Sequence, residues 1–159
     1  MAQEEVTRLI EEMKLSFAGD EHGEARYGPA LKWLLHDVDA QLALRRPFPN
    51  LHTIWELVLH VIAWKKYTAA RLRDESALMT DEINWEPILR TDEAAWKDVV
   101  SNLESAQAEL LDAASRLTDE NLSTPPAGGK TPRYRALHGI MQHDIYHGGQ
   151  IALLKKAAG

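Results

Sequence analysis

Apolar residues recur at intervals of three and four positions along almost the whole chain, and this spacing constrains the fold more than any other feature. Such a period places apolar side chains on one face of an α-helix, whereas a half-buried strand needs strict alternation. The segments that follow the helical period are 6–17, 29–44, 54–64, 96–117 and 137–154. No strand pattern competes with them. The sequence therefore predicts an all-α protein.

Residues at the segment ends predict where the helices begin and stop. Thr53 and Glu56 have the spacing of a capping box, in which each side chain satisfies a free backbone N–H. Pro29 and Pro132 suit the first turn of a helix, and Thr131 is the predicted cap of the last one. The first helix is expected to stop near Gly19.

Long helices joined by moderate loops favour an up-and-down four-helix bundle. Its four helices are predicted from 29–44, from 53 onward, from 96–117 and from 131 onward, with the helix at 6–17 as an extra N-terminal helix. The third of these five helices is apolar on nearly every side up to Trp64, as expected for a central helix. The charged run that starts at Lys65 then predicts that it emerges into solvent. A length of 159 residues suits a single domain spanning 1–159.

The charge balance limits the classes of partner. Eighteen basic against 24 acidic residues give a net charge of −6, which argues against nucleic acid and an anionic membrane surface. The chain has no cysteine, so disulfides and thiolate metal sites are excluded. Residues 1–14 lack the basic start and apolar block of a signal peptide, and no stretch is long enough to span a membrane. We therefore expect a cytoplasmic protein.

His60, His143 and His147 are the candidate metal ligands. Residues four apart lie about 40° from each other around a helix, so His143 and His147 share one face. His60 lies in the most apolar helix, where each nitrogen of a neutral imidazole needs a partner. A metal ion bound by three histidines retains an open position for water or substrate, as catalytic sites do.

A simpler interpretation stays open, because two histidines four residues apart occur often by chance and a single buried histidine is usually a hydrogen-bonded core residue. His22, His52 and His138 are expected to be exposed or capping residues. His36 lies on a helix that also packs in the bundle, and whether it contributes a fourth contact is left open.

Three stretches together resemble the DinB-like family of bacterial helical-bundle proteins. They are RRPFPNLHTIWELVLHVIAW, AAWKDVVSNLESAQAELLDAASRLTDENL and RALHGIMQHDIYHGGQIALLKK, the last with an HxxxHxxQ core. The resemblance covers roughly residues 27–156. It implies a four-helix bundle, a divalent ion, commonly nickel or zinc, bound by three histidines at the positions of His60, His143 and His147, and a homodimer built through helix faces.

The activities that the resemblance implies are diverse. Some members of the family are similar to transferases or isomerases that use a low-molecular-weight thiol, and many are described as metal-dependent hydrolases without a proven reaction. For this chain the prediction is a metal-dependent transferase or hydrolase acting on a small molecule. The alternative is a non-enzymatic, stress-responsive metal-binding dimer.

Six further residues are weaker candidates, four of them for catalysis or ligand binding and two for lining a pocket. Glu56 lies on the face of His60 and could act as a base or hold a ligand in place, although the capping box explains it fully. Asp144 lies about 100° around the helix from His143 and is expected to support a ligand or to be solvated. Tyr146 and Gln150 could orient a bound molecule. Trp55 and Trp64 could line a pocket, although core positions are the commoner role of such residues.

Overall fold

The computed structural model of the protein describes residues 4–26 and 28–158. The helices are α1 (Glu4–Ala18), α2 (Leu31–Leu34), α3 (Ala40–Leu44), α4 (Ile54–Leu72), α5 (Asp81–Asn84), α6 (Glu93–Ser115) and α7 (Arg133–Ala158), with a 3-10 turn, η1, at Asn121–Ser123. The only β-type pairing within the described ranges is an isolated bridge between Glu24 and Pro29. The predicted all-α fold is therefore confirmed.

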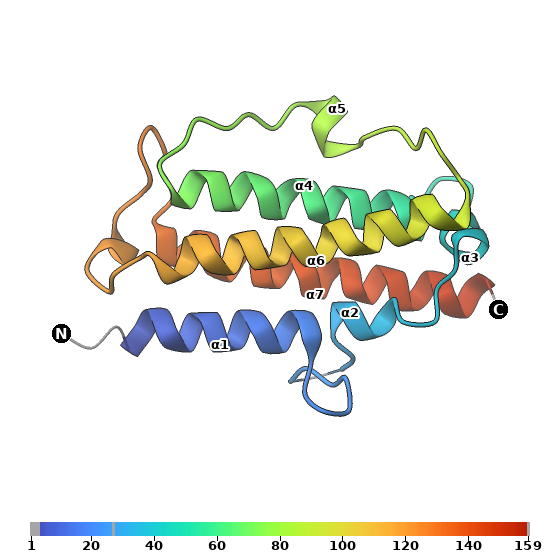
Figure 1. Cartoon of the computed structure of the whole chain (residues 1–159), viewed down its shortest axis with the longest axis horizontal. Coiled ribbons are helices and arrows are strands. Elements are labelled where there is room, and N and C mark those ends of the chain that lie inside the picture. Colours follow the sequence, from blue (N-terminus) through green and yellow to red (C-terminus); the bar gives the residue numbers. More distant parts are fainter. Residues whose placement is uncertain (1–3, 27, 159) are drawn as a thin grey trace.

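The long helices α1, α4, α6 and α7 lie side by side as a bundle (Figure 1). Both α1 and α4 pack against α6 and against α7, so α1 and α4 occupy opposite corners. The side chains between them form two apolar clusters, one around Trp55, Trp96 and Ile151 and the other around Val6, Leu110 and Leu137. None of the described helices combines the length and the apolar character needed to cross a membrane.

The predicted helix over residues 29–44 is wrong, because this segment forms two short helices. Between α2 and α3 the chain turns, and the Asp39 carboxylate accepts the Leu42 N–H at 2.8 Å and caps α3 as a new helix. Aspartate favours this capping role over a helix interior, because its short side chain competes for backbone N–H groups. The apolar pattern continued across the break and concealed it.

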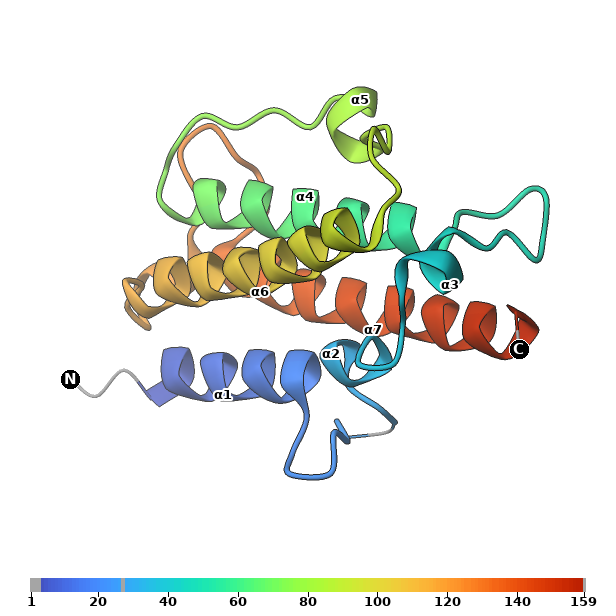
Figure 2. The same ribbon diagram turned by 45° about the vertical axis from the view of Figure 1, so that its right-hand side comes forward.

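The N-terminal helix is a corner of the bundle rather than an addition to it. In both views α2 lies beyond the end of α1 along the same line, and the two together run along α7 (Figures 1 and 2). The loop between them leaves α1 at Gly19, as predicted, with φ of +77°. A Cβ at this position would lie 2.5 Å from the Gly23 carbonyl carbon, so the turn requires glycine.

The starts of α4 and α7 test the two predicted caps. The Thr53 hydroxyl accepts the Glu56 N–H at 3.2 Å and the Glu56 carboxylate accepts the Thr53 N–H at 2.7 Å, which confirms the capping box. Helix α7 begins at Arg133, so Pro132 directly precedes it and Thr131 lies one residue too early for the capping position.

Candidate metal centre

His60, His143 and His147 meet in the interface between α4 and α7. His60 lies near the middle of α4, and the other two lie one turn apart on α7. The Nε2 atom of His143 lies 3.0 Å from Nε2 of His60 and 3.2 Å from Nε2 of His147. His60 and His147 are buried and His143 is half-buried. The structure thus brings together the three residues selected from the sequence, and this cluster could hold a metal ion.

The hydrogen bonds of the outer ring nitrogens determine which nitrogens face the centre. His60 donates its Nδ1–H to the Asn84 carbonyl oxygen at 3.0 Å, and His147 donates its Nδ1–H to Gln150 Oε1 at 2.7 Å. A neutral imidazole carries a single ring proton, so Nε2 of both residues presents a lone pair inward. His143 can donate to one of them at most. Without a cation, at least one inward-facing nitrogen in this cluster lacks a partner.

The donor set fits a divalent transition metal. Tetrahedral zinc with Zn–N bonds of about 2.0–2.1 Å places neighbouring ligand nitrogens roughly 3.3 Å apart. The two short Nε2 separations, 3.0 and 3.2 Å, are close to that spacing. Imidazole nitrogens also suit nickel, copper and iron, so the geometry selects a class of ion rather than one element.

Burial keeps these imidazoles in the form that binds metal. It lowers the pKa of His60 and of His147. Burial, followed by the neighbouring His147 and His60 and by Lys65, lowers the pKa of His143 to about 3. Metal ligands must be unprotonated, and these shifts favour the neutral form at neutral pH.

The connection between α4 and α6 covers the His60 side of the cluster. It carries α5, which lies over α4 (Figure 1). Besides the Asn84 carbonyl bond to His60, the Asn84 side chain accepts the Trp64 Nε1–H at 2.9 Å. The Trp85 ring stacks on His60 with centroids 4.2 Å apart and on His52 at 3.6 Å. Asn84 and Trp85 were not predicted, because nothing in a polar loop sequence indicates which helix it folds onto.

Of the six weaker candidates, Gln150 contacts the cluster through a hydrogen bond, whereas Tyr146, Glu56 and Trp55 do not. Gln150 holds His147, as described above. Tyr146 is 65% exposed with its ring 5.0 Å from that of His147. Glu56 is engaged in the capping box and in an ion pair with Arg46 at 2.8 Å. Trp55 packs on Trp96 in the core, with centroids 5.1 Å apart.

Asp144 is buried and paired with Lys65, which corrects the prediction that α4 emerges into solvent at Lys65. The Lys65 side chain is fully buried and contacts the Asp144 carboxylate and Gln107 Oε1, the latter at 2.7 Å. Burial lowers the pKa of Lys65 and raises that of Asp144, while each partner's charge opposes the shift. The sequence did contain a signal: Lys65 follows Val58 and Val61 by seven and four positions, on the buried face of α4.

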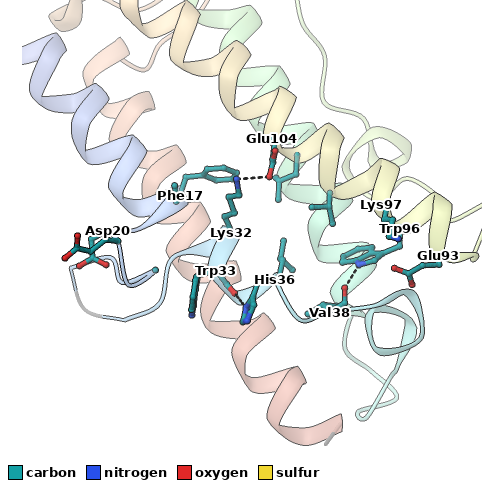
Figure 3. A pocket seen from close by; sticks show the side chains of 16 residues that line it. Phe17, Asp20, Lys32, Trp33, His36, Val38, Glu93, Trp96, Lys97 and Glu104 are labelled. Carbon is teal, nitrogen blue, oxygen red and sulfur yellow. Dashed lines mark hydrogen bonds and ion pairs between the residues drawn. The ribbon is translucent and has the colours of Figure 1, made fainter.

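His36 does not join the cluster. It lines a separate cavity between α2 and α6, of about 640 Å³, together with Trp33, Trp96 and Lys97 (Figure 3). Its Nδ1 lies 2.7 Å from the Trp33 carbonyl oxygen. Figure 3 also shows the ion pair between Lys32 and Glu104 at the rim of this cavity, at 2.9 Å. His22 and His52 are exposed, and His138 lies beside Tyr134 with ring centroids 4.5 Å apart.

A cleft of about 610 Å³ adjoins the cluster at His143. Trp64, Tyr67 and Arg71 line it from α4, and Arg135 and Gly139 line it from α7. Of the two tryptophans named as candidate pocket residues, Trp64 thus lines a cleft, with its ring 5.9 Å from that of His143. A small molecule in this cleft would lie directly beside a candidate metal ligand.

Gln150 provides a test of the arrangement around His147. Replacing it with leucine removes the acceptor for the Nδ1–H while keeping a similar volume. We expect Gln150→Leu to weaken zinc binding by about 10–100-fold, the usual effect of losing a hydrogen-bond partner of a histidine ligand. Isothermal titration calorimetry with zinc measures it, with Gln142→Leu on the same helix as the control. Equal affinities of the two variants would contradict the assigned role.

Comparisons with known proteins place the chain in a family. The model of the DinB superfamily matches residues 28–151. No curated protein and no solved structure matches the chain. The matched region contains His60, His143, His147 and Gln150. Since it also makes up most of the sequence, the chain belongs to the DinB superfamily.

Proposed function

We propose that the protein binds one divalent metal ion, nickel or zinc, through His60, His143 and His147, and that it is a metal-dependent enzyme. The observation that carries the proposal is the convergence of three Nε2 atoms, of which two bear inward lone pairs fixed by Asn84 and Gln150. No other group of three metal-binding side chains was found in residues 4–26 and 28–158.

The cleft at His143 favours catalysis over a purely structural ion. A structural site is closed, with four protein ligands, whereas a catalytic one has three and an open position. Here three histidines converge, and one of them lines a cleft with polar residues. When bound, such an ion lowers the pKa of a thiol or of water at its open position.

We propose transfer to a low-molecular-weight thiol as the reaction, with hydrolysis as the second candidate. In the transfer, the thiol gives its proton to solvent, its sulfur bonds to an electrophilic carbon, and the leaving group departs with the bonding electrons. Asn84 and Gln150 keep two ligand rings oriented, and Trp85 shields the His60 face from water. Trp64 and Tyr67 supply an apolar wall for the substrate.

The test begins with elemental mass spectrometry of untagged protein, followed by assays of the nickel- and zinc-loaded forms. Cysteine and other bacterial low-molecular-weight thiols are the acceptors, and 1-chloro-2,4-dinitrobenzene is the electrophile that releases chloride. We expect thioether formation that depends on both metal and thiol and is lost in His143→Ala. Metal binding with neither thiol transfer nor hydrolysis would favour the non-enzymatic, stress-responsive alternative.

The expected homodimer is part of the proposal. Helix α7 exposes Ile145 and Leu153, at 63% and 56%, and we propose that the second chain packs on this helix. Light scattering on the purified protein measures the mass in solution. A mass of one chain at micromolar concentration would contradict the dimer.

A further inference from the structure

The cleft beside His143 is positively charged at the end away from the histidines. Arg71, Lys130 and Arg135 line it, and no aspartate or glutamate is among its lining residues. This imbalance runs against the whole chain, which carries a net charge of −6. The local charge therefore differs in sign from that of the molecule.

The neighbouring acids form their ion pairs with other residues, although the charge of Arg71 helps to lower the pKa of Asp74. Arg71 donates to the backbone carbonyl oxygens of Glu75 and Ala127. Asp74 pairs with Arg133 at 2.6 Å, and the Glu75 carboxylate pairs with Arg73 at 2.8 Å. Within the described ranges, Lys130 and Arg135 have no acidic partner.

Arg135, Gly139 and His143 lie in one row on α7, four residues apart. The row runs along roughly 12 Å of helix axis from the cationic end to the histidine cluster. Gly139 is the middle residue of this row, and a Cβ built on it would face open space, with nothing to contact within 4 Å. The glycine therefore leaves open space between the charge and the candidate ligand, with Trp64 and Tyr67 on the facing helix.

We propose that the substrate is a small molecule with an anionic group, a carboxylate or a phosphate, which binds to Arg135, Lys130 and Arg71 while its reactive end lies at His143. This inference deepens the proposed function and rests on it. Guanidinium and ammonium groups are the usual partners of both anions. Because Arg135 and His143 lie two helix turns apart, the substrate must be long enough to pass over Gly139 and reach both of them.

Charge reversal tests the proposal. The full-length protein as purified is titrated with succinate and with inorganic phosphate, followed by tryptophan fluorescence and calorimetry. Trp64 lines the cleft and provides the optical signal. The cleft variant is the double variant Lys130→Glu and Arg135→Glu. The control is a second double variant, Arg116→Glu and Lys156→Glu, which changes the net charge by the same amount at exposed sites that do not line the cleft.

We expect at least about tenfold weaker binding of one or both anions in the cleft variant, because the reversed charges would lie against the anion. The control should change binding by less than about twofold, because its charges lie outside the cleft and are screened by salt. Gly139→Leu adds a side chain to the open space without altering charge, and it should also abolish binding. No anion binding in the wild type, or equal weakening in both double variants, would overturn the inference.

Metal content measured on the same samples separates the two proposals. Specific anion binding in protein that takes up no zinc or nickel would remove the proposed function and leave an anion site. Normal metal content with no anion binding would overturn the inference alone.

Discussion

Zinc or nickel should raise the melting temperature of the wild-type protein by roughly 8–16 °C when present at 1,000 times its dissociation constant. At that ratio, binding to the folded state alone contributes about 4.1 kcal/mol. For a chain of this size each kcal/mol shifts the melting temperature by about 2–4 °C. Calorimetry of apo and loaded protein measures the shift.

Replacing any one of the three histidines should remove most of this metal-dependent shift. The lone pairs of His60 and His147 are oriented by fixed hydrogen bonds, and His143 lies between them, so two remaining ligands cannot keep the arrangement. His138→Ala on the same helix is the matched control and should keep the full shift. A loss of metal in His138→Ala, or full retention in His143→Ala, would contradict the site.

Breaking the buried ion pair should have the largest effect on the stability of the metal-free protein. Lys65→Met leaves the Asp144 carboxylate in the core without its counter-charge. Removing one partner of such a pair costs about 3–5 kcal/mol, because the other charge stays buried. Urea unfolding of apo protein measures the loss in the free energy of unfolding.

Two controls separate the buried charge from general effects of substitution. The double variant Lys65→Met and Asp144→Leu removes both charges and should recover much of the lost stability. Lys32→Met breaks the pair with Glu104, whose side chains are about half exposed, and should cost less than about 1 kcal/mol. Equal losses in Lys65→Met and Lys32→Met would show that the Lys65–Asp144 pair carries no special energetic role.

The sequence was a good guide wherever a local pattern carried the information. Helical spacing predicted the four long helices, Thr53 and Glu56 predicted the start of α4, and the four-residue interval placed His143 and His147 on one face. Each of these depends on contacts within one helix. His60 was added because an imidazole in an apolar helix needs partners.

What escaped prediction depends on contacts between segments that lie far apart along the chain. The break between α2 and α3 is invisible to a period that continues through it. Lys65 was expected in solvent. The carboxylate that pairs with it, Asp144, lies 79 positions away in α7, so no local pattern indicated the pair. Asn84 and Trp85 reach His60 only because the connection folds back over α4. No local pattern encodes such return contacts.

The two oriented ligands differ in how easily evolution can alter them. His60 donates to a main-chain carbonyl, an acceptor that every residue type at position 84 would also supply if the loop kept its path. His147 donates to the side chain of Gln150. Most substitutions at position 150 would remove this acceptor or replace it with a charged one. A single substitution at position 150 therefore changes the support of the His147 ring directly, whereas the support of the His60 ring changes only if the whole connection between α4 and α6 takes another path.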